Sequence, residues 1–278
     1  MIAALLAICR PYYAVPMSLA YALTLYYALG GRMAGEWAGA AVSAAALALV
    51  IAAGYVLNDV CDLAADRVNA PWRPIAAGRI SRRAAAVWGV LLFACGLGLA
   101  TAARLEFLAA LAAVAAGLVL YDLVSKRLGI GKQLLVAVLM TSMYPLALAQ
   151  AGGVGGPRAA ALPVFAAWMF LTAFGYEVLK DIRDIPGDRA GGGPVTQVQR
   201  RPRLWRGVAG GTILAAAVLL VAPVLLGCGW VYMAVAAAAM VAAGASVLLP
   251  VRRAIMAVYA ECFLVGVAAA LDPLILGF

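Results

Sequence analysis

Nine apolar stretches of about 20 residues dominate this chain. An α-helix of that length crosses the hydrocarbon core of a bilayer, about 30 Å, and satisfies its own backbone hydrogen bonds there. The chain is 67% hydrophobic, a share well above that of soluble domains. The sequence therefore predicts an all-α, polytopic membrane protein with nine transmembrane helices, forming one integral-membrane domain over residues 1–278. The expected helices cover, approximately, residues 12–30, 36–57, 84–103, 106–124, 133–151, 160–179, 205–226, 229–249 and 256–276.

The positions of lysine and arginine test this count of helices independently. If the chain crosses the membrane nine times, 18 of its 21 basic residues fall on the side of the N-terminus, and only Arg32, Arg104 and Arg158 fall on the other. Cytoplasmic loops of membrane proteins are rich in lysine and arginine. We therefore expect a multi-pass protein of the cell membrane, with the N-terminus in the cytoplasm and the C-terminus on the opposite side.

The net charge of +9 would also suit a nucleic-acid partner. The basic residues, however, lie on short loops whose charge the membrane orientation explains, and no base-stacking motif accompanies them. We therefore expect no nucleic-acid partner. Histidine is absent and the five cysteines are scattered along the chain. This excludes histidine-based zinc or haem sites and Ser–His or Cys–His nucleophiles, so the chemistry must use carboxylates, amides, hydroxyls and cations.

Six of the twelve acidic residues form two strings of the same spacing, D-x-x-D-x-x-x-D-R, about 120 residues apart, and Glu177 brings the total in these two places to seven. The first string covers residues 59–67 and the second 181–189, with Glu177 one helical turn before the second. Spacings of three and four residues place the acids of each string on one helical face. Both strings follow the cytoplasmic ends of expected membrane helices. The repetition predicts an internal pseudo-repeat that brings two acidic motifs to the same membrane face.

Six or seven carboxylates in one region repel one another unless a cation neutralises them. Oxygen ligands without histidine or clustered cysteine favour hard cations, and Mg²⁺ commonly binds a few carboxylates together with the phosphate oxygens of a substrate. The nearby basic residues Arg73, Lys126 and Lys180 suit the negative charge that a metal-bound diphosphate retains. The two strings therefore indicate a site for a magnesium-bridged diphosphate.

The residues around both strings resemble the motifs of the UbiA superfamily of membrane prenyltransferases. Residues 58–66 resemble the family's NDxxDxxxD motif, residues 180–188 its KDxxDxxGD motif, and residues 69–78 its N-x-P-x-RPI-x-x-G loop. The tyrosine-to-lysine segment at 121–126 and the Arg-Pro pair at 10–11 are also similar to family features. The resemblance extends over the whole chain and implies the family's nine-helix architecture.

The resemblance implies a role for each matching residue. Two Mg²⁺ ions would be held by Asn58, Asp62, Asp66, Asp181, Asp184 and Asp188. The diphosphate would be bound by Arg10, Arg67, Arg73, Lys126 and Lys180. The residues expected to act in catalysis are Asp62, Asp66, Asp184 and Asp188.

The resulting hypothesis is a magnesium-dependent prenyl transfer from a prenyl diphosphate donor to a lipophilic acceptor. The metals and cations stabilise the leaving diphosphate, the C1–O bond ionises toward an allylic cation, and the acceptor attacks C1. The prenyl tail lies in an apolar groove between the helices, open to membrane lipid. Tyr55, Tyr121 and Tyr176 are candidates either for shielding the cation or for the aromatic belt at the membrane interface.

The acceptor is the less defined partner. The loop after the first string and the sequence of the second string resemble those of the branch that makes archaeal-type ether lipids. That branch transfers geranylgeranyl to geranylgeranylglyceryl phosphate. Two segments depart from that branch: Ala76–Ala77, which is similar to the homogentisate and decaprenyl-phosphate branches, and residues 191–196. An aromatic acceptor such as 4-hydroxybenzoate, as in quinone biosynthesis, therefore stays open.

Three other classes of protein share some of these features. A cation transporter would use acids within the membrane, but in this chain they lie at helix ends among basic loops. A CDP-alcohol phosphotransferase also uses paired aspartate motifs, but neither string opens with the Asp-Gly of that class. A terpene cyclase of the same superfamily would share both motifs and differs in releasing diphosphate without an acceptor.

Overall fold

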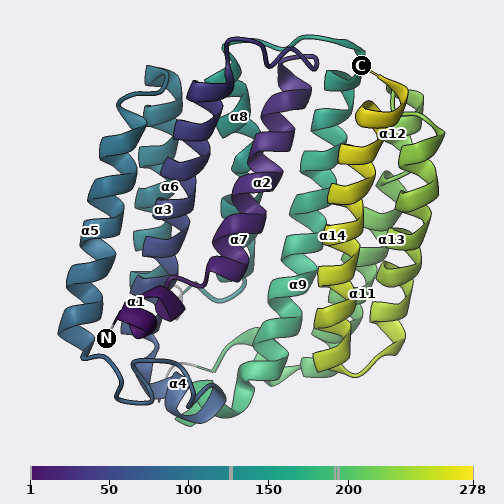
Figure 1. The fold of residues 1–278 in the computed structure, drawn as a ribbon. Coiled ribbons are helices and arrows are strands. Elements are labelled where there is room, and N and C mark those ends of the chain that lie inside the picture. Colours follow the sequence, from purple (N-terminus) through teal and green to yellow (C-terminus); the bar gives the residue numbers. More distant parts are fainter. Residues whose placement is uncertain (1, 125–127, 191, 193–194, 278) are drawn as a thin grey trace.

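The computed structural model describes residues 2–124, 128–190, 192 and 195–277, which form a bundle of helices (Figure 1). Eight helical segments are long and apolar enough to cross a membrane. The ninth span consists of α1 (Ile2–Ile8) and α2 (Pro11–Ala28), which meet at a bend of 51°. The described part of the chain contains no β-strand, so the prediction of an all-α protein with nine spans is confirmed.

Each expected span has a counterpart in the structure. The next four spans are α3 (Trp37–Cys61), α5 (Arg82–Ala100), α6 (Leu105–Val124) and α7 (Gly131–Thr141) with α8 (Met143–Ala151). The last four are η2 (Pro157–Ala161) with α9 (Leu162–Ala190), α11 (Pro202–Leu219) with α12 (Ala222–Leu225), α13 (Trp230–Leu248) and α14 (Val251–Leu276). Among the described residues, two further short helices lie outside the spans, α4 (Leu63–Asn69) and α10 (Gln197–Arg200). Because α3 and α9 run past their expected ends near 57 and 179, each acidic string begins on a membrane helix.

Small residues let the membrane helices approach closely, which is the main source of helix association in lipid. On α9, Gly175 packs against α11 so tightly that a β-carbon there would lie 2.7 Å from Thr212 Oγ1. On α5, a β-carbon at Gly96 would lie 3.0 Å from the Ala46 carbonyl oxygen of α3. The helices α3 and α9 that carry the acidic strings are thus each held by a close-packed neighbour.

Three hydrophobic clusters make up the core. The largest contains buried residues of both halves of the chain, from Tyr21 on α2 to Ala269 on α14. The second joins α9, α11, α13 and α14 around Leu179 and Ile213, and the third joins α1, α3 and α5 around Val56. Leu179 and Val56 lie within three residues of the acidic strings. At that end, therefore, the two halves have separate apolar cores, and the polar residues lie between them.

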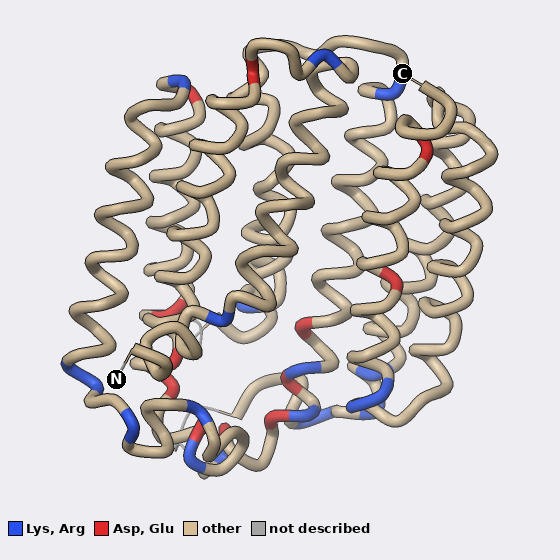
Figure 2. Tube along the Cα trace, viewed as in Figure 1, with Lys and Arg blue, Asp and Glu red and all other residues tan. Residues whose placement is uncertain are grey.

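Charged side chains gather at the two ends of the bundle (Figure 2). The N-terminus lies toward the end with most of the charges, and the C-terminus lies at the other. Arg32, Arg104 and Arg158 come before α3, α6 and α9, and they contact the loops at Gly155, Gly152 and Gly227, respectively. The structure thus separates the basic residues into the two faces expected for a multi-pass membrane protein.

Candidate active site

The first acidic string lies across a break between α3 and α4. Helix α3 ends at Cys61 and α4 begins at Leu63, so Asp62 lies between them with φ −97° and ψ 13°. The Val60 carbonyl oxygen, two residues before the break, accepts from Arg82 Nε at 2.9 Å. The prediction that these acids share the face of one helix is therefore wrong for the first string, because the helix is interrupted at Asp62.

Asp59 is the anchor of the first string. Its side chain is 1% exposed and is paired with Arg10, and Arg73 Nη1 lies 3.4 Å away. Arg10 precedes Pro11 and has a left-handed backbone with φ 47°, a strained conformation that surrounding contacts must stabilise. Its guanidinium carbon lies 4.8 Å from the centre of the Tyr55 ring. Arg10 is thus beside the first string, as expected, and holds Asp59 in place.

Four oxygen-bearing side chains complete the first string's side of the site. Asn58 Nδ2 donates to Asp62 Oδ2 and to Asp122 Oδ1, both at 3.1 Å. Asp66 is buried and accepts a hydrogen bond from Arg73 Nη1. Burial raises the pKa of the Asp66 carboxyl, and the bond from Arg73 opposes that rise. Asp122, at the end of α6, was missed from sequence, where only the tyrosine and lysine of its segment were singled out.

The second string lies on one continuous helix. Helix α9 runs through Pro186 to Ala190, so the prediction of a shared helical face is confirmed for this string. Asp181 is 4% exposed, and its carboxylate accepts from Lys132 Nζ at 2.5 Å and from Gln133 Nε2. This first aspartate is therefore held by α7, much as Asp59 is held by Arg10 before α2.

The later acids of the second string have different partners. Arg183 Nε and Nη2 donate to the two carboxylate oxygens of Asp184, each at 2.7 Å. Gln199 Nε2 lies 3.4 Å from Asp188 Oδ2. Gln199 also forms a reciprocal capping box with Thr196 at the start of α10. The short helix α10 thus supports the last aspartate of the string.

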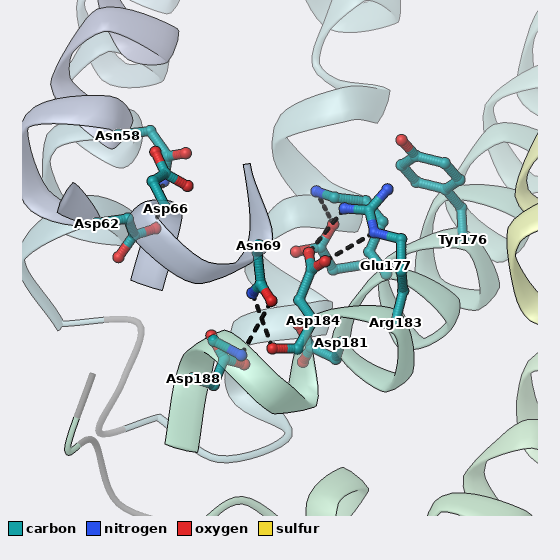
Figure 3. A network of polar contacts seen from close by, with 12 residues as sticks. Asn58, Asp62, Asp66, Asn69, Tyr176, Glu177, Asp181, Arg183, Asp184 and Asp188 are labelled. Carbon is teal, nitrogen blue, oxygen red and sulfur yellow. Dashed lines mark hydrogen bonds and ion pairs between the residues drawn. The ribbon is translucent and has the colours of Figure 1, made fainter. Parts of the chain in front are cut away.

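Asn69, the last residue of α4, joins the two strings (Figure 3). Its Nδ2 donates to the Asp184 carbonyl oxygen at 2.9 Å, and its Oδ1 accepts from the Gly187 backbone N–H at 2.9 Å. A β-carbon at Gly187 would overlap this amide, so glycine is required for the approach. The contact packs α4 onto α9 and places the two strings face to face, as the pseudo-repeat predicted.

Glu177 interacts with two lysines beside the second string. It is 1% exposed, accepts from Lys180 Nζ at 2.8 Å, and lies 3.8 Å from Lys132 Nζ. The Tyr121 hydroxyl donates to Glu177 Oε1 at 3.4 Å. Lys132 was not singled out from sequence, because its partner lies 45 residues further along. The expected cations not yet placed are Arg67, which is exposed on α4, and Lys126, which lies outside the described residues.

A row of tyrosines joins the two halves of the bundle beside these charges. Tyr259 of α14 is hydrogen-bonded to Tyr13 of α2 and to Tyr176 of α9. Tyr13 stacks on Tyr55 with ring centroids 5.2 Å apart, and Lys180 Nζ lies 5.5 Å from the centre of the Tyr176 ring. Tyr55 and Tyr176 were expected near the site. Tyr13 and Tyr259 were not, since neither lies near an acidic string in the sequence.

The oxygen donors of this site suit magnesium in kind. Figure 3 shows Asp62 and Asp66 on one side of Asn69 and Asp181 and Asp184 on the other. Asp122 belongs to the first side, because it is bonded to Asn58. In the described part of the chain, no three acidic or cysteine side chains are already close enough to hold a metal ion. Since Mg²⁺ usually takes one or two carboxylates and completes its shell with phosphate oxygens and water, the residues fit an ion that arrives with a phosphorylated substrate.

Comparison with known sequences agrees with this geometry. A sequence model of the UbiA prenyltransferase family matches residues 14–267. The digeranylgeranylglyceryl phosphate synthase of Methanoculleus marisnigri is 36% identical over 69% of this chain and 66% of its own length. The enzyme of the same name from Methanopyrus kandleri is 34% identical over 71% of this chain and 72% of its own length.

Solved structures share the fold. A UbiA homolog from Aeropyrum pernix K1 superimposes with a TM-score of 0.74 at 21% identity, over 95% of this chain and 97% of that chain. A UbiA homolog from Archaeoglobus fulgidus, bound to GPP and Mg²⁺, gives a TM-score of 0.71 at 14% identity, over 97% and 99% of the two chains. At these identities the likeness establishes the architecture.

Proposed function

The chain belongs to the UbiA prenyltransferase family, and from this premise we propose that its two acidic strings jointly bind a prenyl diphosphate with Mg²⁺. The observation that carries the proposal is the Asn69 contact, which holds the strings face to face. The A. fulgidus homolog bound to GPP and Mg²⁺ supports the donor and the metal. Each string offers its own carboxylates, which supports two ions bridged by the diphosphate.

We propose that the transferred group is geranylgeranyl and that the acceptor is geranylgeranylglyceryl phosphate. The support comes from relatives named digeranylgeranylglyceryl phosphate synthase. The matched part spans 66% of the first relative's own length. The reaction would form the bond between C1 of the prenyl group and the acceptor hydroxyl oxygen, break the C1–O bond to diphosphate, and release the hydroxyl proton.

The residues of the site have two roles in this proposal, metal binding and diphosphate binding. Bound Mg²⁺ would supply positive charge to the oxygens of the leaving diphosphate. The residues that would hold it are Asn58, Asp62, Asp66, Asp184 and Asp188. Arg73 and Lys180 bind the diphosphate oxygens, together with Arg10, Arg67 and Lys126 where they reach it.

Asp181 has a different task from the other acids of α9 in this proposal. It was expected as a metal ligand, but it is buried and its two oxygens are engaged by Lys132 and Gln133 of α7. The Asp184 side chain, in contrast, is 28% exposed and among the described residues is bonded only by its own neighbour Arg183. A carboxylate held by two donors orients the helix that carries it. We therefore assign Asp181 to positioning α9 against α7.

The row of tyrosines suits the cation that would form on the prenyl group. Aromatic faces attract a cation within about 6 Å, and Tyr55 and Tyr176 already lie that close to Arg10 and Lys180. Their neighbour Tyr13 stacks on Tyr55. The rings are thus placed to shield an allylic cation from water while the acceptor attacks.

We propose that the single domain 1–278 lies in the cell membrane with the N-terminus and both acidic strings in the cytoplasm. The asymmetry of the basic residues supports this orientation. A reporter that folds only in the cytoplasm, fused to the C-terminus, is expected to stay inactive, whereas the same reporter at the N-terminus is active. The reverse pattern would contradict the orientation.

The function is tested with membranes, Mg²⁺, labelled geranylgeranyl diphosphate and a panel of acceptors. Geranylgeranylglyceryl phosphate is expected to give a labelled lipid with two geranylgeranyl chains, and EDTA is expected to abolish the product. Labelled product with 4-hydroxybenzoate alone would overturn the acceptor. Diphosphate release at full rate without any acceptor would indicate a cyclase, and undiminished transfer in EDTA would overturn the metal.

A further inference from the structure

Helix α9 presents two neighbouring faces to the site. Helix α9 meets α7 through the Asp181 side chain and meets α4 through the backbone of Asp184 and Gly187. Tyr176 and Arg183, two helical turns apart, share the next face, and the Tyr176 hydroxyl is bonded to Tyr259 of α14. Figure 3 shows Arg183 on the side of Asp184 that lies toward Tyr176. Arg183 therefore lies on the face of α9 that, at Tyr176, meets the contact between α2 and α14.

Two arginines neutralise acids that the proposed function gives to the metal. Arg73 bonds Asp66, and Arg183 donates two hydrogen bonds to Asp184. When a divalent cation takes those carboxylates, each guanidinium loses its anion, which is costly in a site partly shielded from water. Arg73 then has the diphosphate as its partner. Arg183, whose side chain is 32% exposed, is accessible to a ligand, and the proposed function gives it no anion to replace Asp184.

Arg183 faces the seam between the two halves of the bundle, where α2 meets α9 and α14. Tyr176 lies two helical turns before Arg183 on the same face of α9, and Tyr259 is hydrogen-bonded to both Tyr176 and Tyr13. One turn further along α14, Cys262 lines an apolar cavity shared by α2, α8, α9 and α14. The same seam thus has tyrosine hydroxyls on the side of Arg183 and apolar side chains deeper in the bundle.

We propose that Arg183 binds the phosphate of the acceptor lipid, and that it becomes free to do so when Mg²⁺ takes Asp184. The inference rests on the proposed function, since it requires an acceptor with a phosphate head group. A guanidinium holds a phosphate with two parallel hydrogen bonds, the geometry in which Arg183 now holds the Asp184 carboxylate. The exchange makes acceptor binding depend on a site already loaded with metal.

Equilibrium binding tests the exchange without turnover. The protein in lipid nanodiscs is titrated with geranylgeranylglyceryl phosphate or with geranylgeranylglycerol, in the presence of inorganic diphosphate and either Mg²⁺ or EDTA. With Mg²⁺, the phosphorylated lipid is expected to bind about 10- to 100-fold more tightly than the alcohol. In EDTA, where Asp184 keeps the guanidinium, this preference is expected to fall to about threefold or less. An equal preference in both conditions would contradict the exchange.

Variants identify the residue responsible. R183Q is expected to lose the preference for the phosphorylated lipid in Mg²⁺, and R183K, which keeps the charge without the paired donors, is expected to keep part of it. R203Q, at an exposed arginine of the first turn of α11, is the matched control and keeps the full preference. Magnesium-dependent binding of inorganic diphosphate to R183Q confirms that the variant is folded. Full preference in R183Q would overturn the inference.

Transfer kinetics distinguish the failure of this inference from failure of the proposed function. If the wild-type protein transfers only to 4-hydroxybenzoate, the proposed acceptor is wrong whatever Arg183 does. If it uses geranylgeranylglyceryl phosphate, R183Q is expected to raise the KM of this acceptor far more than the KM of geranylgeranyl diphosphate. An equal rise in both would show that Arg183 serves the donor site, and only the present inference would fail.

Discussion

The two acidic strings share one spacing but differ in backbone. The second lies on the uninterrupted α9, whereas the first is divided between α3 and α4 at Asp62. In both strings the first aspartate is buried and paired with a cation from another helix or turn, Arg10 for Asp59 and Lys132 for Asp181. The later acids lie toward the opposite string. In both strings, therefore, the first aspartate anchors the string and the later acids are the proposed metal ligands. This order is the same whether the helix is continuous or broken.

The difference in backbone explains how two strings on separate membrane helices meet. The break at Asp62 lets α4 turn away from the axis of α3 and pack on α9, where Asn69 bonds Asp184 and Gly187. Helix α9 needs no break, because it provides the surface on which α4 packs. The break thus brings the first string to the second, which lies on the continuous helix α9.

Removing a ligand from either string has the largest expected effect. D62A and D184A are each expected to lower the rate of prenyl transfer by about 10²- to 10³-fold, since neither string alone would stabilise the leaving diphosphate. The rate is measured in membranes with saturating Mg²⁺. Thermal unfolding is the control and is expected to change little, because both residues lie at the polar face. Full activity in one of the two variants would show that the strings are not equivalent.

Removing an anchor is expected to affect folding before chemistry. D59N removes the carboxylate charge that is paired with the buried Arg10, a change that costs about 3–5 kcal/mol of stability. D181N is expected to cost less, because the half-buried Lys132 keeps Glu177 at 3.8 Å. The measurement is thermal unfolding in detergent, with activity normalised to the folded fraction. If D181N keeps its unfolding temperature and loses Mg²⁺-dependent diphosphate binding, Asp181 is a ligand and the two strings divide their tasks differently.

Breaking the contact between the strings is expected to have an intermediate effect. N69A loses two hydrogen bonds, together about 1–3 kcal/mol, and kcat/KM for the donor is expected to fall about 10-fold. N69D keeps the acceptor for the Gly187 N–H but cannot donate to the Asp184 carbonyl, so it is the matched partial variant. Wild-type kinetics in N69A would mean that the strings stay together without this residue.

The smallest expected effect tests the break itself. R82Q removes the donor to the Val60 carbonyl oxygen, and activity is expected to fall about threefold, since a single hydrogen bond to a charged donor is lost at an exposed site. R83Q, at the exposed neighbouring arginine, is the control. A larger loss in R83Q than in R82Q would show that the Arg82 hydrogen bond does not cause the break at Asp62.

The sequence predicts those features that depend on local pattern. Apolar stretches predict the nine spans, and the basic residues predict the two faces of the bundle, because length and charge act segment by segment in a membrane. The spacing of the strings predicts the helical face of α9 for the same reason. These features are confirmed as far as the described residues extend.

Features that depend on contacts between distant segments were not predicted. The break at Asp62 involves Arg82, 20 residues later, and Asp122 joins the first string from another helix. Lys132 and Tyr259 likewise reach the site only through packing. Spacing within one segment contains no information on such partners, which is why the anchoring roles became apparent only in the structure.

The central claim is that the two strings act as one site, and a double-mutant cycle tests it most directly. The measurement is kcat/KM for geranylgeranyl diphosphate in the wild type, D62A, D184A and D62A/D184A. If both strings hold one metal–diphosphate unit, the second substitution is expected to add little to the first, so the double variant loses about as much as either single variant. Losses that multiply, so that the double variant falls by the product of the two single effects, would show that the strings act independently and would contradict the single shared site.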